Sequence, residues 1–305
     1  MRVFLAGGSG VIGRPLIPQL AAAGHEVWAT TRTPAKLEDL RALGAVPVLL
    51  DALDGEAVRA AVRESRPEAI IHQLTALPPV YDPTKPSFFE ATGRLRTEGT
   101  RHLVEAGTEA GVRRFVFQSI SFMHKLAGPA VLDEDAPLDE ASPATAQTVA
   151  GERLILDAGG VVLRHAQLYG PGTYFAADGD FGKRARRRML PVLGDGGGVF
   201  SFLHVEDAAA AAVAALAGGS GAYNIADDEP APAREWIPVF CDAVGAPRPL
   251  HIPFWLGRLV AGSLVANAMA NFRGSANARA KAELGWAPSR PSWRSGFYEL
   301  SSPAR

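Results

Sequence analysis

The sequence predicts an α/β fold in which a doubly wound parallel sheet is followed by a smaller, mainly helical C-terminal region. Short β-branched apolar runs alternate with helical patterns through the first half of the chain. These runs are continuously apolar, which is typical of strands covered by helices on both faces. A glycine-rich turn joins the first run to the first helical pattern. Together these observations indicate a sheet of the doubly wound type.

The first half contains the predicted strands and the helices between them. The first helix places Leu16, Ile17 and Leu20 on one face, as a helix packed against a sheet requires. The predicted strands span residues 3–6, 27–30, 46–50, 69–72, 115–118 and 161–164. The predicted helices span residues 15–23, 35–43, 56–64, 97–110 and 150–157.

The pattern changes after residue 170, where glycine and proline become dense and regularity falls. We therefore expect a dinucleotide-binding domain over residues 1–165 and a substrate-binding region over residues 166–305. Within the latter, a helix at 206–217 and a strand at 222–225 are expected to return to the sheet, so that residues 205–226 belong to the first domain. The part after Trp236 is expected to be mostly helical, with loops interrupted by prolines.

Composition excludes several classes of partner and location. The 305 residues carry 31 Lys and Arg against 32 Asp and Glu, so no nucleic acid or anionic membrane partner is expected. Cys241 is the only cysteine, which rules out an intrachain disulfide and fits a reducing compartment. The longest apolar stretch, 208–217, is far shorter than the ~20 residues of a membrane span, and the first residues lack a signal peptide pattern. We expect a cytoplasmic protein.

The glycine-rich turn satisfies the spacing of a dinucleotide-binding motif. Glycine is required there for a tight turn, for close approach of the backbone to a pyrophosphate, and for packing of the helix on the strand. The helix N-terminus then offers free N–H groups to the phosphates. The order of strand, turn and helix therefore predicts a Rossmann-type cofactor site. Its residues are Gly7, Gly8, Gly10, Val11, Ile12 and Gly13.

The end of the second strand indicates which dinucleotide is bound. NAD-selective sites place an acidic residue there for the ribose hydroxyls. This chain has Thr31 and Arg32 instead, with Lys36 one turn later. Arg32 can bind a 2′-phosphate through a forked charge-assisted contact. The sequence therefore predicts NADP(H) as the cofactor.

Further motifs give the chain a resemblance to the extended and atypical short-chain dehydrogenase/reductases, the group that contains sugar-nucleotide epimerases and dehydratases. The resemblance runs nearly end to end and implies that two loops line the cofactor. The loop after the third strand contains Asp51, Ala52 and Leu53, and the loop after the fourth contains Leu74, Thr75 and Ala76. Later matching segments are 98–100, 114–121, 163–164, 169–172, 204–208, 223–225 and 283–286.

The chain departs from this group at its catalytic Tyr-x-x-x-Lys motif. Counting back from the Gly151-Glu152 pair puts the lysine position at Thr148 and the tyrosine position at Ala144. In the group, a tyrosine with a pKa lowered by the lysine gives or takes the proton during hydride transfer. Neither alanine nor threonine can do so.

Other polar residues are candidates for the chemistry. Ser119 and Ser121, at the end of the fifth strand, can hydrogen-bond a substrate carbonyl, or else satisfy local backbone groups. His124 can transfer a proton near neutral pH, or else lies in a surface loop. The loop around Glu134 is expected to be exposed beside the site, and His72 and His165 are interpreted as core residues. No metal site is expected.

Three functions remain open from the sequence. The first is an NADP(H)-dependent oxidoreductase acting on a small carbonyl, alcohol or enone, with its proton taken from His124, another nearby group or water. The second is an isomerase, lyase or cyclase that keeps the cofactor without net redox. The third is a non-enzymatic NADP(H) sensor. A homodimer is expected as a possible assembly, and a small molecule is the expected substrate.

Overall fold

The computed structural model describes residues 1–85 and 87–300, with the side chains of residues 143 and 144 left out. Its centre is a seven-stranded sheet in the order β12-β7-β5-β4-β1-β2-β3, and every neighbouring pair is parallel. This confirms the predicted doubly wound sheet. The strands are β1 (Arg2–Ala6), β2 (Glu26–Thr31), β3 (Val46–Leu49), β4 (Ala69–His72), β5 (Arg114–Ile120), β7 (Val161–His165) and β12 (Gly221–Ile225).

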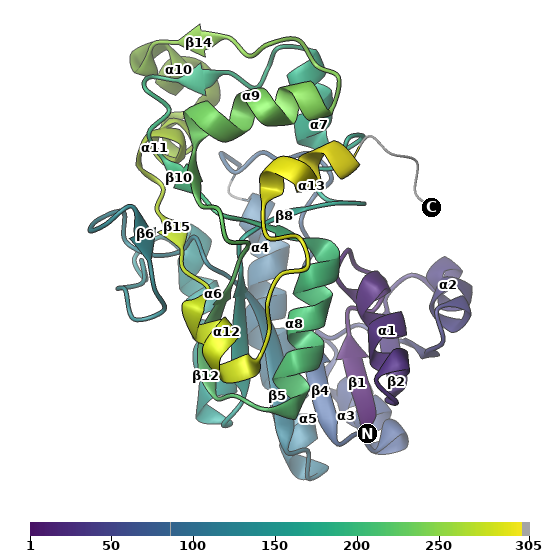
Figure 1. Ribbon diagram of the computed structural model, residues 1–305. Coiled ribbons are helices and arrows are strands. Elements are labelled where there is room, and N and C mark those ends of the chain that lie inside the picture. Colours follow the sequence, from purple (N-terminus) through teal and green to yellow (C-terminus); the bar gives the residue numbers. More distant parts are fainter. Residues whose placement is uncertain (86, 301–305) are drawn as a thin grey trace.

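Helices cover both faces of the sheet (Figure 1). One face packs on α1 (Gly13–Ala22), α2 (Leu37–Ala42), α8 (Val205–Ala217) and α12 (Ala278–Leu284), with η1 (Pro34–Lys36) leading into α2. The other face packs on α3 (Gly55–Ser65), α5 (Thr100–Glu109) and α6 (Pro143–Asp157). Alternate residues along each strand enter the two apolar cores: Val3 and Leu5 face α1 and α8, whereas Phe4 faces α3 and α5.

The rest of the chain forms a lobe over the carboxyl ends of the strands (Figure 1). Its core is aromatic and includes the fully buried Trp236, Phe240 and Phe297. The helices of the lobe are α7 (Asp180–Arg186), α9 (Ala233–Ala243), α10 (Phe254–Ala261), α11 (Ser263–Asn271) and α13 (Trp293–Glu299). Short strands in and beside it are β6 (Val131–Leu132), β8 (Gln167–Tyr169), β9 (Val192–Leu193), β10 (Val199–Phe200), β11 (Phe202–His204), β13 (Ala231–Pro232), β14 (His251–Ile252) and β15 (Gly274–Ser275).

Two predicted helices begin earlier than expected. The helix predicted at 97–110 is the end of a continuous stretch made of α4 (Ser87–Arg94), the π-helical turn η2 (Leu95–Gly99) and α5. The helix predicted from residue 150 begins at Pro143, directly after Ser142. Serine followed by proline is a common helix start, because proline fixes the first helical φ and needs no hydrogen-bond acceptor. Both extensions bring additional residues to the carboxyl end of β5.

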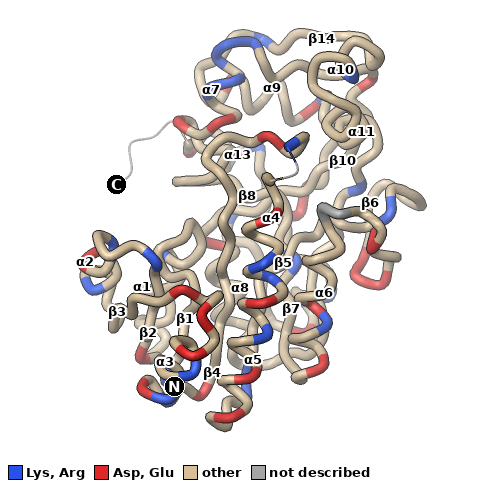
Figure 2. The backbone as a smooth tube through the Cα atoms, turned by 180° about the vertical axis from the view of Figure 1, so that it is seen from behind, with Lys and Arg blue, Asp and Glu red and all other residues tan. Residues whose placement is uncertain are grey.

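Charged residues of both signs are interspersed along the chain (Figure 2). In the basic α7, Arg184 pairs with Asp180 at 2.8 Å and donates to the Tyr81 carbonyl at 2.7 Å, so it holds the lobe to the loop that follows β4. Within the described ranges no helix is long and apolar enough to cross a membrane. No group of His, Cys, Asp or Glu residues suited to holding a metal ion occurs in the same part of the chain.

The Asp227 carboxyl predicts a pH dependence of stability. It is 2 % exposed, its Oδ2 has no hydrogen-bond partner, and burial raises its pKa to about 8. A carboxyl pKa that is higher in the folded state stabilises below the unfolded value near 4 and loses that contribution as pH rises towards 8. Asp227→Asn should therefore reduce the loss of stability from pH 5 to pH 8.5, measured by urea unfolding. Parallel pH profiles for both proteins would contradict this.

Candidate functional site

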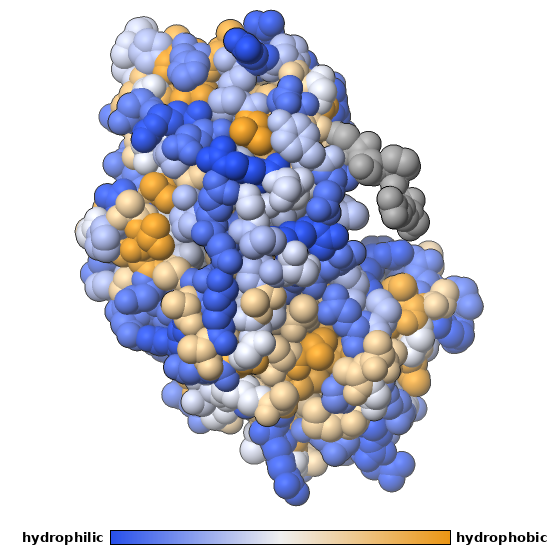
Figure 3. All heavy atoms as spheres, viewed as in Figure 1, coloured by the Kyte–Doolittle hydropathy of each residue, from blue (hydrophilic) through white to orange (hydrophobic). Residues whose placement is uncertain are grey.

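The candidate site lies at the carboxyl ends of the strands, below the lobe. Ligands of doubly wound sheets bind in the crevice at this edge. The surface is hollowed between the lobe and the part that carries α1 and α2 (Figure 3). The strand order β3-β2-β1-β4-β5 places the glycine-rich turn after β1 between the end of β2 on one side and the end of β4 on the other. A long ligand lying over the turn would therefore reach both.

The glycine-rich turn has no space for side chains. A Cβ on Gly13 would lie 2.3 Å from the Gly7 carbonyl oxygen, and a Cβ on Gly7 would lie 2.9 Å from the Gln73 backbone. Gly7 also has a positive φ of 96°, which favours glycine. Thr30 holds the turn by accepting hydrogen bonds from Gly7 N–H at its Oγ1, at 3.1 Å, and from Gly8 N–H at its carbonyl, at 3.0 Å. The turn thus has the close-packed form that a pyrophosphate cradle needs.

The end of β2 presents free cations beside this turn. Thr31 is buried, accepts a hydrogen bond from Ser9 at 3.0 Å, and orders the turn that follows by accepting from Thr33 N–H at 3.2 Å. Arg32 and Lys36 are exposed. Neither forms an ion pair within residues 1–85 and 87–300, whereas the nearby Arg14 pairs with Asp39 at 3.2 Å. The chain thus offers two unpaired positive charges at the place where a ribose 2′-phosphate lies in NADP-binding sites.

The two loops that the resemblance assigns to the cofactor border the same crevice. Asp51 is exposed, and its Oδ1 accepts from the Leu53 N–H at 3.0 Å, while Ala52 is buried against α5. On the other side, Leu74 and Ala76 are half-buried and Thr75 is exposed. Val11 and Ile12 follow the glycine turn, with Val11 exposed and Ile12 in the apolar core. These positions suit a dinucleotide that crosses from β3 to β4.

Several buried polar atoms at the ends of β4, β5 and β7 have no hydrogen-bond partner in the described part of the chain. They include both amide atoms of Gln73, the Ser119 hydroxyl and both ring nitrogens of His165. Buried polar atoms without partners cost stability unless a ligand or water satisfies them. The grouping of these atoms at one edge of the sheet therefore fits a ligand with many polar atoms, such as a dinucleotide.

A buried arginine lies next to Thr148, the position that the resemblance assigns to the family's lysine. Arg96, from η2, donates from Nη1 to the Thr148 hydroxyl on α6 at 2.5 Å, and its Nε has no partner. Burial lowers its pKa to about 10, so it remains a cation at neutral pH. The neutral Thr148 side chain is thus in direct contact with the positive charge of Arg96. The side chain of Ala144 lies outside the described residues.

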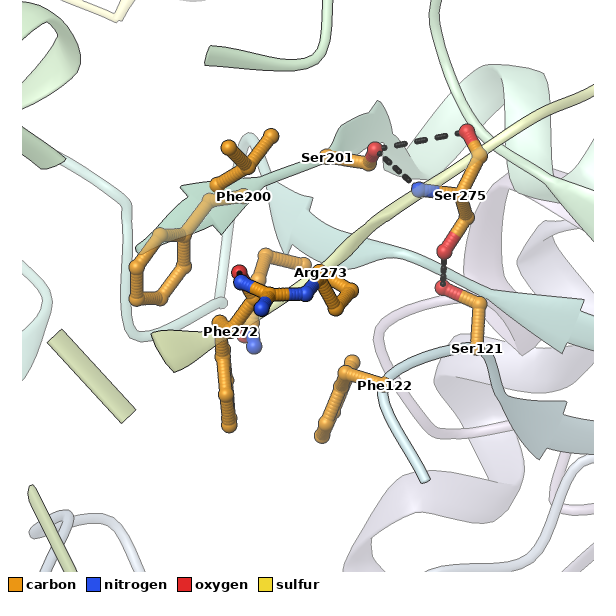
Figure 4. Close-up of a pocket in the computed structure, with 9 residues that line it drawn as sticks. Ser121, Phe122, Phe200, Ser201, Phe272, Arg273 and Ser275 are labelled. Carbon is orange, nitrogen blue, oxygen red and sulfur yellow. Dashed lines mark hydrogen bonds between the residues drawn. The ribbon is translucent and has the colours of Figure 1, made fainter. Parts of the chain in front are cut away.

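Ser121 is fixed by the lobe. Its hydroxyl accepts a hydrogen bond from Ser275 at 2.8 Å, and Ser275 in turn donates its backbone N–H to the Ser201 hydroxyl at 2.9 Å (Figure 4). With Ser275 as donor, the hydroxyl proton of Ser121 remains available to a ligand. Ser119 is completely buried, on the face of the sheet covered by α6.

The histidines near the site are neutral at physiological pH. Burial lowers the pKa of His72 to about 4 and that of His165 to about 3, as expected for core residues. Burial also lowers the pKa of His124, which is 6 % exposed and therefore not in a surface loop. The His124 Nδ1 lies 2.9 Å from the Ala136 carbonyl, so this nitrogen carries the proton and Nε2, which has no partner, is an acceptor.

A buried ion pair underlies the site. Arg164 on β7 contacts Glu152 on α6 through three hydrogen bonds of 2.8–3.2 Å and donates to the Glu134 carbonyl at 3.0 Å. Glu134 itself is buried and accepts from the Asn224 N–H at 2.7 Å, so the loop expected to be exposed is held to β12. Sequence reasoning missed this because Arg164 and Glu134 are brought together only by the sheet.

The comparisons with known proteins agree with this geometry. The model of the NAD dependent epimerase/dehydratase family matches residues 3–226. The chain belongs to this family. A Streptomyces protein named 3-diazoavenalumate denitrifying reductase is 47% identical over 97% of this chain and 99% of its own length. NAD or NADP is thus the cofactor type characteristic of the family.

Solved structures of the family show the same fold. The UDP-glucose 4-epimerase of Thermotoga maritima, solved with UDP-glucose, superposes with a TM-score of 0.79 at 21% identity, covering 98% of this chain and 96% of the other. A human epimerase family protein with NADPH gives a TM-score of 0.76 at 23% identity, covering both chains completely.

The buried ion pair generates a stability prediction. Glu152→Gln leaves the Arg164 guanidinium buried without a counter-charge, which should lower the free energy of unfolding by about 3–5 kcal/mol. The measurement is urea unfolding followed by circular dichroism. The matched control is Arg153→Gln, which breaks an exposed pair with Glu140 on the same helix and should cost at most about 1 kcal/mol. Equal losses of unfolding free energy in the two variants would show that the buried pair stabilises the protein no more than the exposed pair does.

Proposed function

We propose that this protein is an NADP(H)-dependent reductase that replaces an aromatic diazo group by hydrogen. The observation that carries the proposal is that the buried histidines around the ends of β4, β5 and β7, which are His72, His124 and His165, all have lowered pKa values and so carry no acidic proton at neutral pH. The name of the Streptomyces relative, a denitrifying reductase of a diazo compound, supports the same reaction. The glycine-rich turn and the free Arg32 and Lys36 support NADP(H) as the cofactor.

The two kinds of reduction differ in their need for a proton. Reducing a carbonyl adds a hydride to carbon and a proton to oxygen, so an acid must be present. Reducing an arenediazonium adds a hydride to the ring carbon while the carbon–nitrogen bond breaks and its electron pair leaves with N₂. The substrate cation becomes a neutral arene, the dihydronicotinamide becomes its oxidised cation, and no proton is consumed. Such a reaction can proceed without the tyrosine and lysine.

The acid–base groups of the site fit the second reaction. His72, His124 and His165 are neutral at pH 7, and the pKa of Arg96, about 10, keeps it charged. Ser119 and Ser121 are hydroxyls with no base bonded to them. These residues can orient a ligand by hydrogen bonds, and none is an acid of suitable strength.

The remaining residues would bind and orient. The glycine-rich turn would hold the pyrophosphate, Arg32 and Lys36 the 2′-phosphate, and the unpartnered Gln73 amide and Ser119 hydroxyl the nicotinamide end. The bound cofactor would supply the hydride. Ser121 would direct its free hydroxyl proton towards a substrate oxygen and so align the ring.

Cofactor choice can be tested at Arg32. Arg32→Ala removes a charge-assisted contact of about 1.5–3 kcal/mol, so the KM for NADPH should rise about 10-fold to 100-fold with little change for NADH. Steady-state kinetics with both cofactors measure the effect. Arg41→Ala, which removes an exposed arginine of α2 paired with Glu38, is the control and should leave both values unchanged. A wild-type enzyme that uses NADH as well as NADPH would contradict the assignment.

The reaction can be tested with a diazotised aminocinnamate and 4-deuterated NADPH. We expect one N₂ released per NADPH oxidised, deuterium on the ring carbon that carried the diazo group, and a kcat that is flat from pH 6.5 to 8.5 because the reduction consumes no proton. A reaction without enzyme gives the background. Turnover of ketones or enones instead, product formation without net NADPH oxidation, or tight NADPH binding without any turnover would each overturn the proposal in favour of carbonyl reduction, isomerisation or sensing.

A further inference from the structure

A small cavity lies where the end of β5 meets the lobe. As it stands, the enclosed space of about 10 Å³ has room for about one water molecule. Ser121 and Phe122 line it from the side of the sheet, and Phe200, Phe272 and Arg273 line it from the lobe (Figure 4). The cavity therefore adjoins the end of β5, the strand that neighbours β4 in the sheet.

The walls of the cavity are aromatic. Phe122 and Phe272 come from opposite halves of the protein and face one another with ring centroids 6.1 Å apart and planes only 28° from parallel (Figure 4). Phe200 lies 5.0 Å from Phe272 on its other side. Parallel rings on either side of a space favour a flat, aromatic occupant, because stacked arrangements add to the gain from burial alone.

Arg273 supplies a cation above these rings. Its Nη1 donates to the backbone carbonyls of Asn271 at 3.1 Å and Phe272 at 3.5 Å, which leaves the Nε side of the guanidinium free. Nε is buried and has no partner, and Arg273 forms no ion pair with any residue of 1–85 or 87–300. The rest of the side chain is part-exposed, and a carboxylate fits the free edge of a guanidinium with two parallel hydrogen bonds.

The serines complete the polar side. Ser275 follows Arg273 by two residues and bonds to both Ser121 and Ser201, so the arginine segment is tied to the end of β5 (Figure 4). The position of the Arg273 backbone relative to the Ser121 hydroxyl is therefore fixed by the short segment to Ser275 and its hydrogen bonds. Such an arrangement can hold one end of a rigid ligand by charge and the other by a hydroxyl group.

We propose that this cavity binds the substrate as a planar aromatic carboxylate, with the carboxylate on Arg273 and the ring between Phe122 and Phe272. The inference rests on the proposed function, since it places the substrate of the reductase at the end of β5. A flat ring between two others needs about 7 Å between their centroids, twice the 3.5 Å contact distance. The two phenylalanine rings must therefore separate by about 1 Å, and the cavity, which has room for about one water molecule, must widen when the ligand enters.

Binding without turnover tests the inference. The probes are cinnamate, its neutral amide, and 3-cyclohexylpropanoate, each titrated by calorimetry into the full-length protein saturated with NADP⁺. We expect cinnamate to bind at least 10-fold more tightly than the amide, which lacks the charge, and than the cyclohexyl acid, which lacks the flat ring. Because no probe carries a diazo group, failure of the diazo reaction leaves this result unaffected.

Variants assign the effect to its residues. Arg273→Gln should abolish the preference for cinnamate over the amide, and Arg273→Lys should restore part of it, because lysine keeps the charge but not the fork. Phe272→Leu should weaken the binding of cinnamate several-fold more than the binding of the cyclohexyl acid. Arg258→Gln, on the exposed face of α10, is the control and should change nothing. Thermal melting of each variant verifies folding.

Two outcomes would overturn the inference. One is equal affinity for cinnamate and its amide in the wild-type protein. The other is binding of uridine diphosphate that competes with cinnamate and depends more strongly on Arg273, which would make the cavity a nucleotide diphosphate site. If cinnamate binds as expected while diazotised aminocinnamate is not reduced, the proposed function fails and the binding class stands.

Discussion

The Arg164 side chain joins the elements that meet beneath the site. Through Glu152 it fixes α6 to the sheet, and through the Glu134 carbonyl it fixes the loop that follows β5. Glu134 extends the connection to β12 by accepting from Asn224 N–H. Because breaking a buried ion pair leaves an uncompensated charge, this arrangement disfavours other placements of α6 over β5. Arg96 and Thr148, which contact one another across η2 and α6, depend on that placement.

The two ends of the crevice have different physical characters. At the β2 end, Arg32 and Lys36 are exposed and solvated, which suits a phosphate that keeps part of its hydration. At the β5 end, Ser119, Gln73 and the Arg96 Nε are buried, so hydrogen bonds there are strong and the absence of partners is costly. Under the proposed function, phosphate binding and alignment of the reacting atoms would thus be separated along the sheet, with the glycine-rich turn between them.

The first of these ends could be predicted from the sequence and the second could not. Gly7, Gly13 and Arg32 follow predicted strands directly, and the parallel order of the sheet brings successive strand ends together. The pocket at β5 joins Ser121 to Ser275, which are 154 residues apart in sequence, so no local pattern identifies the pair. Arg96 was missed because the helix containing it was expected to begin one residue later, at 97, and the π-helical turn that aims it inwards has no apolar periodicity.

The expected absence of the family's tyrosine and lysine would have a second consequence with the proposed diazonium substrate. Phenolates couple to diazonium ions, and free amines add to their terminal nitrogen, so a tyrosine of lowered pKa beside a lysine would be attacked by the compound it is meant to reduce. Ala144 and Thr148 present no such nucleophile, and Arg96 brings its charge as a guanidinium, which stays protonated and is a poor nucleophile. Burial also raises the pKa of Tyr174, near the loop after β4, to about 12, which keeps it a neutral phenol. The same substitutions that remove a proton donor would therefore protect the site from its own substrate.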